Sequence, residues 1–306
     1  MTAPSGVLLV FLDGVGIGPD DPAVNPFVHA AARLPTLLRT MGGATPTLER
    51  PRVSGPHGHA FPLAATLDVE GTPQSGTGQV ALLTGESAAE LFGGHFGPWT
   101  PVRLRPLLEE RSVLRRAAGP GRRIAFANAY PRGWPGPKGG RRVAGPPLAA
   151  RGAGVLDRHQ EALARGDAVA SEIVNDGWRS RLGYEALPEI TAREAGSNLA
   201  RIACGADLTL FAHYATDTAG HAQDMPAAVA ALTRVDAFLD GVLAGLPPDI
   251  LLLVASDHGN LEDVRSGHTR NPVLGVAVGP GAEAAAELSD LREVTPFILR
   301  VLGVEV

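Results

Sequence analysis

The chain has 306 residues, 44% of them hydrophobic, so it can bury a sizeable core as one large domain or as a core with an insert. Its formal net charge of -5 provides no bulk attraction to nucleic acid or to an acidic membrane surface, and neither partner is expected. A single cysteine, Cys204, excludes an internal disulfide framework and a metal site built from several cysteines. No basic segment precedes the short apolar run near the N-terminus. We therefore expect neither a signal peptide nor a membrane span, and a cytoplasmic protein.

The N-terminal third begins with a predicted strand. Residues 7–12 form a continuous apolar run of strand length, as in a parallel strand buried on both faces. The run ends at Asp13, and glycines at 14, 16 and 18 follow. These glycines open onto Pro19-Asp20-Asp21-Pro22 rather than onto a helix, which disfavours a dinucleotide-binding fold. Further along, the sequence predicts a helix over residues 26–41, an extended segment over 61–67 and a helix that starts after Gly78.

The middle of the chain has a different amino-acid composition. From about residue 93 to residue 196, proline, glycine and arginine cluster, and residues 124–127 are the one short apolar stretch that predicts a strand. We expect residues 96–204 to form an inserted cap domain, with residues 1–95 and 205–306 as the core.

The last third alternates between strands and helices. Strands are predicted at residues 207–212, 250–255 and 272–278, and helices at 227–243 and 290–302. This alternation predicts an α/β fold with a doubly wound, mostly parallel sheet.

Acidic and histidine side chains lie at or just after the predicted strand ends, where open α/β sheets bind ligands. Each has an ordinary reading on its own, as a turn residue, a helix cap or a packed histidine. Asp217 and His221 are four residues apart, so on one helical turn they face the same side. Nitrogen and oxygen donors without sulfur suit zinc, manganese or magnesium. We therefore predict sites for two divalent ions from six residues: Asp13, Asp217, His221, Asp257, His258 and His268.

These residues lie in segments that resemble the alkaline phosphatase superfamily of metalloenzymes, in particular its branch of cofactor-independent phosphoglycerate mutase and phosphopentomutase. Residues 255–260 (Ala-Ser-Asp-His-Gly-Asn) and 267–273 (Gly-His-Thr-Arg-Asn-Pro-Val) are similar to a block of those mutases. Asp217-Thr218-Ala219-Gly220-His221 is similar to their Asp-x-x-Gly-His motif, and residues 12–18 to their N-terminal metal loop. The resemblance covers residues 5–95 and 205–306.

The resemblance implies a role for each residue. One ion would bind Asp217, His221 and His268, and the other would bind Asp13, Asp257, His258 and a nucleophile. Ser75 falls at the position of the nucleophilic serine, with Thr77 as the fallback. A bound divalent ion would lower the pKa of the serine hydroxyl, and the backbone N–H groups of the following helix would face phosphate oxygens. Taken alone, without the neighbouring ligand candidates, Ser75 would be interpreted as a helix cap.

Two positions depart from the family pattern. Gln79 replaces the histidine that ends the nucleophile motif, and Gln74 replaces its asparagine, which leaves the identity of the substrate open. A sulfatase is disfavoured because no Cys/Ser-x-Pro-x-Arg motif surrounds Ser75. Candidate substrate-binding residues come from the middle of the chain, where arginines suit phosphate: His95, Arg103, Arg105, Asn128, Arg132 and Arg179.

The expected function is phosphoryl transfer on a small phosphorylated metabolite through a phosphoserine, as a mutase or a phosphatase with manganese, zinc or magnesium. A phosphodiesterase of the same superfamily and a catalytically inactive metal-binding module remain as alternatives. The sequence fixes neither the substrate nor the oligomeric state.

Overall fold

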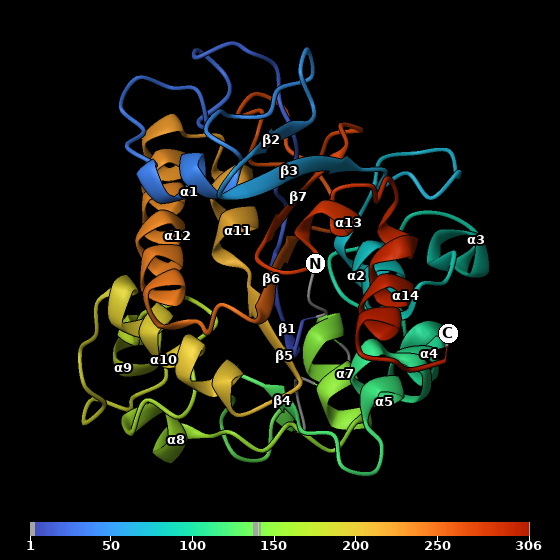
Figure 1. The fold of residues 1–306 in the computed structure, drawn as a ribbon, viewed down its shortest axis with the longest axis vertical. Helices are drawn as coiled ribbons and strands as arrows, with labels where there is room; N and C mark the ends of the chain where they lie inside the picture. Colours follow the sequence, from blue (N-terminus) through green and yellow to red (C-terminus); the bar gives the residue numbers. More distant parts are fainter. Residues whose placement is uncertain (1–3, 137–139, 141, 306) are drawn as a thin grey trace.

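The computed structural model describes residues 4–136, 140 and 142–305, and it shows a mixed sheet between helices (Figure 1). The strand order is β2-β3-β7-β6-β1-β5-β4. In chain order, the strands are β1 (Gly6–Leu12), β2 (Val53–Gly55), β3 (Gly58–Leu63), β4 (Ile124–Phe126), β5 (Leu208–His213), β6 (Ile250–Ala255) and β7 (Val273–Val278).

Four neighbouring strands run in the same direction. β1 is parallel to both β5 and β6, and β4 is parallel to β5. β7 is antiparallel to β6, and β3 and β2 continue the sheet in antiparallel pairs beyond it. The predicted α/β class with a mostly parallel sheet is thus confirmed, and the antiparallel strands form one side of the sheet.

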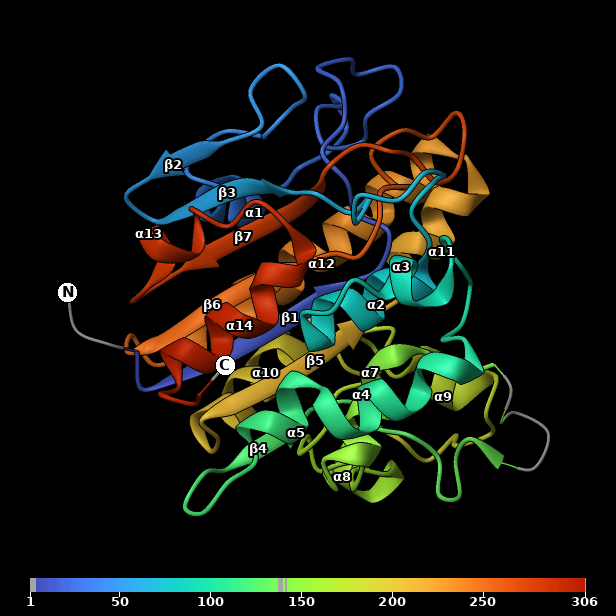
Figure 2. The ribbon, with the colours of Figure 1, turned by 90° about the vertical axis from the view of Figure 1, so that its right-hand side faces the viewer.

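Helices cover both faces of the sheet (Figure 2). Alternate side chains of β1, starting from Val7, pack with α2, α7 and α14, and those starting from Leu8 pack with α1, α10 and α12. The two buried faces explain the continuous apolar run of this strand. In chain order, the helices are α1 (Pro35–Thr40), α2 (Ser75–Thr84), α3 (Ala88–Phe92), η1 (Val102–Leu104), α4 (Arg105–Arg111), α5 (Val113–Ala117), α7 (Gly145–Gly152), α8 (Gln160–Ala164), α9 (Asp176–Ser180), α10 (Ala192–Cys204), α11 (Ala215–Ala222), α12 (Met225–Gly245), α13 (Ala282–Ala285) and α14 (Leu291–Val301).

The helix predicted over residues 26–41 is much shorter in the structure, where only α1 is helical. Residues 19–34 form turns instead, because side chains bind the nearby backbone. The Asn25 Oδ1 accepts from the Phe27 amide at 3.0 Å, and His29 Nδ1 accepts from the Ala31 amide at 3.2 Å. Such local bonds compete with helix formation.

Part of the interval 96–204, expected as a cap, is built into the core. β4 is hydrogen-bonded to β5, and α4, α5 and α7 share a hydrophobic cluster with α2 and α14. The stretches on either side of α7, residues 127–136 and 153–191, instead contain a small separate cluster that consists of Ala129, Leu163, Ala168, Ala170, Trp178 and Leu187. We therefore propose that the cap is narrower than the expected interval and consists of these two stretches.

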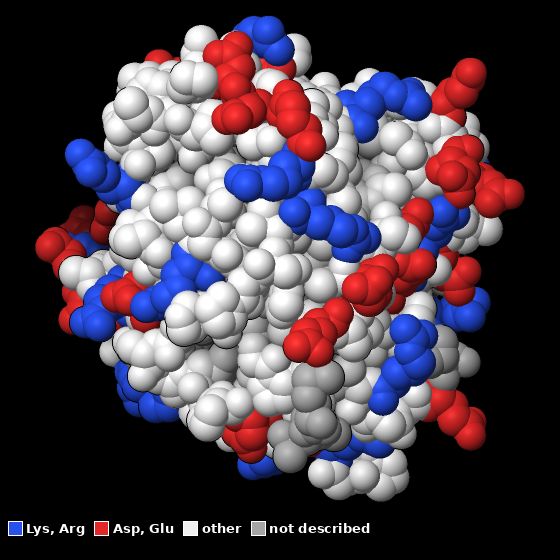
Figure 3. Space-filling model, turned by 45° about the horizontal axis from the view of Figure 1, so that its top comes forward, with Lys and Arg blue, Asp and Glu red and all other residues white. Residues whose placement is uncertain are grey.

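The surface carries both signs of charge. On the face shown in Figure 3, acidic and basic side chains are interspersed among uncharged ones. No helix within the described residues combines the length and the apolar character that a membrane span needs.

Candidate metal centre

Three adjacent parallel strands end at the same edge of the sheet, in the order β6-β1-β5. Asp13 follows β1 directly, and Asp257 and His258 follow β6. The chain after β5 turns into α11, which carries Asp217 and His221. Because parallel strands in register finish side by side, residues far apart in the sequence meet here.

The first group consists of Asp13, Asp257 and His258, all of them buried. Their candidate ligand atoms lie within 4.8 Å of one another. His258 Nε2 is 3.2 Å from Asp13 Oδ1 and 3.8 Å from Asp257 Oδ1. The same nitrogen is 2.9 Å from the Ser75 hydroxyl oxygen. The structure thus brings Ser75 to the group with which the resemblance associates it.

Burial and mutual repulsion shift the ionisation of this group. Burial raises the pKa of Asp13 well above its usual value, and the charge of Asp257 adds to the rise. Burial also raises the pKa of Asp257. Burial acts to lower the pKa of His258, but the carboxylates of Asp257 and Asp13 outweigh it and raise that pKa to about 10. The pocket therefore favours a positive charge between its carboxylates, and a divalent cation would supply it in place of the His258 proton.

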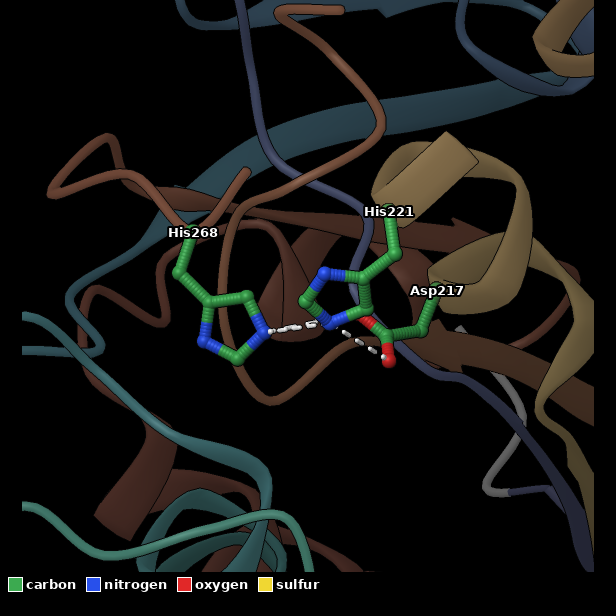
Figure 4. A group of neighbouring side chains, drawn as sticks. All are labelled: Asp217, His221 and His268. Carbon is green, nitrogen blue, oxygen red and sulfur yellow. Dashed lines mark hydrogen bonds and ion pairs between the residues drawn. The ribbon is translucent and has the colours of Figure 1, made fainter. Parts of the chain in front are cut away.

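The second group consists of Asp217, His221 and His268, whose side chains point toward one another (Figure 4). Asp217 and His221 come from one turn of α11, and His268 comes from the loop before β7. His221 Nε2 lies 3.4 Å from Asp217 Oδ2 and 3.1 Å from His268 Nε2. The two groups adjoin, because the rings of His258 and His268 stack with their centroids 4.0 Å apart.

The donor atoms fit divalent cations. Asp13 Oδ1 and Asp257 Oδ2 are buried and have no hydrogen-bond partner among the described residues. His268 Nδ1 is 3.1 Å from the Pro73 carbonyl oxygen, which can only accept, so Nδ1 carries the proton and Nε2 presents a lone pair to His221. Unpaired carboxylate oxygens and imidazole lone pairs that converge in this way are a metal-ligand set.

The candidate nucleophile lies at the first turn of α2. Ser75 is the first residue of the helix and is 2% exposed. The fallback residue, Thr77, has its hydroxyl 3.3 Å from the Gln74 carbonyl oxygen and accepts from the Phe96 amide at 3.3 Å. Ser75 is therefore the hydroxyl directed at the ligand groups, and Thr77 secures the start of α2 to the loop at Phe96.

Glycine lets α2 approach the ligands closely. A Cβ atom added at Gly78 would lie 2.5 Å from the backbone oxygen of Asp257. At Gly14, where φ is +71°, an added Cβ would lie 2.7 Å from Asp217 Oδ1. Larger residues at either position would push the elements of the site apart.

Sequence reasoning missed Glu262, a fully buried carboxylate that joins the loops around the site. Its oxygens accept from the Gly16 amide at 3.0 Å, the Asn260 amide at 2.7 Å and the Asn271 side chain at 3.1 Å, and also from the Thr269 hydroxyl. In the sequence, Glu262 differs from an ordinary surface glutamate only in its position, two residues after Asn260. Asn260 in turn donates to Asp217 Oδ1 at 2.6 Å and so orients a candidate ligand.

Gln79 occupies a buried bridge between the site and α7. Its Nε2 donates to Asp13 Oδ2 at 3.3 Å, and its Oε1 accepts from the Gly145 amide at 2.8 Å. The residue that departs from the family motif thus contacts the candidate ligand Asp13.

The six candidate substrate-binding residues have other contacts in the structure. His95 Nε2 lies 3.3 Å from the Val69 carbonyl oxygen, and the half-buried position lowers the pKa of His95. Asn128 is fully buried and pairs its amide with the backbone of Ala212 at 2.7 and 2.8 Å. The four arginines bind backbone or acidic groups near them: Arg103 contacts Phe92, Arg105 contacts Thr100 and Gly140, Arg132 contacts Glu161, and Arg179 contacts Leu187 and Glu189. Their role toward a substrate stays a prediction.

Comparison with known proteins supports the centre. Residues 178–306 match the model of the metalloenzyme superfamily. The resemblance to alkaline phosphatase-like metalloenzymes is confirmed. The matched part contains five of the candidate ligands, whereas Asp13 and Ser75 lie outside it and reach the site through the fold.

Curated relatives match about two fifths of the chain. The 2,3-bisphosphoglycerate-independent phosphoglycerate mutase of Dinoroseobacter shibae is 33% identical over 129 residues, which are 39% of this chain and 26% of that protein. The enzyme of the same name from Rhodopseudomonas palustris is 35% identical over 131 residues, 39% of this chain and 25% of that protein. The match thus spans about a quarter of the length of these relatives.

Solved structures share the fold across the chain. The PH0037 protein from Pyrococcus horikoshii has a TM-score of 0.58 and 12% identity, with 100% of this chain and 99% of that one covered. The alkaline phosphatase from the Antarctic bacterium TAB5 has a TM-score of 0.52 and 12% identity, with both chains fully covered. Together with the two ligand groups, the family match supports divalent metal binding and, at the level of the superfamily, phosphoryl transfer.

Proposed function

We propose that this protein transfers a phosphoryl group of a small phosphorylated metabolite through a phosphoserine at Ser75, with two bound divalent ions. The observation that carries the proposal is the position of the Ser75 hydroxyl, 2.9 Å from His258 Nε2 and beside two groups of metal-ligand type. Asp13, Asp257 and His258 would hold one ion next to Ser75. Asp217, His221 and His268 would hold the other.

The bound ions would neutralise phosphate charge and lower the pKa of the serine hydroxyl. The protein itself would orient the serine hydroxyl and the phosphate group. Ser75 lies at the start of a ten-residue helix, so backbone N–H groups of the first turn are available to phosphate oxygens. The Ser75 oxygen bonds to phosphorus as the ester P–O bond breaks, the hydroxyl loses its proton, and the leaving oxygen gains one.

The fate of the phosphoryl group separates the two forms of this activity. In a mutase, the dephosphorylated intermediate stays bound and takes the group back on another oxygen. In a phosphatase, water takes the group from Ser75. The proposed cap, residues 127–136 and 153–191, is the part of the chain that would retain or release the intermediate.

The test is a panel of phosphorylated metabolites, with mono- and diesters, supplied with manganese or zinc and followed by phosphorus NMR. An isomeric phosphate ester identifies a mutase, inorganic phosphate identifies a phosphatase, and cleavage of diesters alone identifies a phosphodiesterase. If the protein binds metal yet turns over no compound of the panel, the catalytic proposal is wrong and the chain is a metal-binding module.

A further inference from the structure

Tyr214 lies beside Asp13 on the face of the sheet that carries the first ligand group. β1 and β5 are parallel with Leu12 opposite His213, so Asp13 and Tyr214 are the next residues at the two strand ends. The Asp13 amide donates to the His213 carbonyl oxygen at 2.9 Å, which keeps the two chains side by side at this point. The Tyr214 ring packs edge-on against Phe11, which shares a sheet face with Asp13 because side chains alternate along a strand. Tyr214 therefore borders the metal centre.

A tyrosine of the proposed cap meets Tyr214. The hydroxyl oxygens of Tyr130 and Tyr214 lie 3.4 Å apart, and the nearby Asn128 side chain fixes this part of the cap to the Ala212 backbone. Tyr130 also lines a cavity of about 430 Å³ between the two stretches of the cap. The tyrosine pair thus connects the metal centre to this cavity.

The cavity is lined largely by aromatic and aliphatic side chains. Tyr130 and Trp134 are half-buried, and their ring centroids are 4.6 Å apart. Trp178 and Leu182 line the cavity from the other stretch of the cap, where Trp178 is buried and Leu182 is 51% exposed. Aromatic surfaces bind flat aromatic rings by stacking, which adds to the gain from buried area. The cavity therefore favours a ligand with a planar ring.

Polar groups at the same cavity suit a ring with a polar edge. Glu172 and Arg181 form an ion pair there, with side chains that are 37% and 66% exposed. Among the described residues that line the cavity, Arg181 is the one cation, so its pairing leaves no free charge for a phosphate. The carboxylate accepts hydrogen bonds and the guanidinium donates them, so the pair can bind an edge with both donors and acceptors. A nucleobase has such an edge.

We propose that this cavity binds the base of a nucleoside monophosphate whose phosphate lies at the metal centre. This substrate class rests on the proposed function, since transfer at Ser75 gives the phosphate its place. A volume of about 430 Å³ suits a base, because small-molecule sites measure roughly 300–1,000 Å³. The ribose would then lie beside the pair formed by Tyr130 and Tyr214.

Kinetics of the metal-loaded protein compares the common nucleoside 5′-monophosphates with ribose 5-phosphate, which carries a hydroxyl in place of the base. We expect kcat/KM for at least one nucleotide to exceed that for ribose 5-phosphate by about ten-fold or more, the value of stacking one base. Trp134→Ala should lower this preference about ten-fold, whereas Trp134→Phe keeps a ring and should retain most of it. Trp99→Ala removes a tryptophan outside the lining of the cavity and should leave the preference unchanged. Each preference is a ratio within one protein, so a general loss of activity does not affect it.

Tryptophan fluorescence measures base binding separately from the chemistry at Ser75. Two of the three tryptophans of the chain line the cavity. The matching nucleosides carry no phosphate, and we expect at least one of them to quench the emission of the metal-loaded Ser75→Ala protein in a saturable way.

The outcomes separate the base site from the proposed function. If the protein turns over phosphorylated metabolites without preferring any nucleotide to ribose 5-phosphate, the base site is wrong and the proposed function stands. The base site is also wrong if no nucleoside quenches the emission, or if Trp134→Ala keeps the same preference as Trp99→Ala. If a nucleoside binds but no phosphate ester is turned over, the base site stands and the proposed function is wrong.

Discussion

Ser75 is one of two hydroxyl residues in the first turn of α2, and its contact with His258 distinguishes it from Thr77. Ser75→Ala should lower turnover by at least about a thousand-fold, because the group that forms the bond to phosphorus is lost. Steady-state kinetics on the best substrate of the panel measures the effect. Thr77→Ser, which keeps the hydroxyl at the neighbouring position, serves as the control. Full activity of Ser75→Ala would rule out the phosphoserine.

Gln79 links a candidate ligand to α7 through both ends of its amide. Gln79→Ala leaves the buried Gly145 amide without a partner, so we expect the free energy of unfolding to fall by about 1–3 kcal/mol. Metal affinity should change as well, because Asp13 loses a neighbouring donor. Urea denaturation and metal titration measure the two effects, with the exposed Gln223→Ala as the control. An unchanged unfolding midpoint would contradict this role.

His213 makes stability depend on pH. Its folded pKa of about 4 lies below the ordinary value of 6.5, so the unfolded chain binds a proton more readily between these values. Stability should therefore rise with pH from 4 to 6.5 and level off above, with a loss on the order of 3 kcal/mol at the acid end. Denaturation of wild type and His213→Gln across this range measures the contribution. Equal pH profiles for the two proteins would show that His213 does not titrate in this way.

At the scale of elements, the site depends on how closely α2 approaches the end of β6. Gly78→Ala would place a methyl group 2.5 Å from the Asp257 backbone oxygen, so α2 must move and carry Ser75 with it. We expect turnover to fall by about a hundred-fold, since small displacements of a reacting group have effects of this size. Gly119→Ala is the matched control, because its Cβ meets only the Arg122 side chain, at 3.6 Å. Steady-state kinetics of the two variants measures the effect on turnover, and circular dichroism confirms that both variants fold.

The elements predicted best from the sequence are those whose own residues form a clear hydrophobic pattern. The strands at residues 7–12 and 250–255 are continuous apolar runs, and the structure contains both. The helix predicted over residues 26–41 forms only at residues 35–40, and its first part was wrong because Asn25 and His29 bind the local backbone, an effect that apolar periodicity does not show. The ligand candidates were predictable from residue type and position after strands. Glu262 and the Gln79 bridge were not, because their roles depend on contacts distant in sequence.

For the whole molecule, bound metal should act as a cross-link. The two ligand groups join β1, β6, α11 and the loop before β7, so ions that bind the folded chain stabilise it. At about 100 times Kd, each ion contributes about 2.7 kcal/mol. Removal of both should lower the melting temperature of a chain of 306 residues by about 8 °C. Differential scanning calorimetry before and after chelation measures the shift, and added manganese or zinc should restore it. No shift on chelation would contradict metal binding at these groups.

The proposed cap leaves the sheet after its edge strand β4 and returns through α10. It is fastened to the end of β5, where the Asn128 side chain pairs with the Ala212 backbone and His213 Nδ1 lies 2.7 Å from the Ser171 carbonyl oxygen. The same end of β5 leads into α11, which carries Asp217 and His221. We therefore expect a cap grafted from a relative to preserve the metal centre only if it keeps these contacts, because their loss would let α11 and its two candidate ligands move.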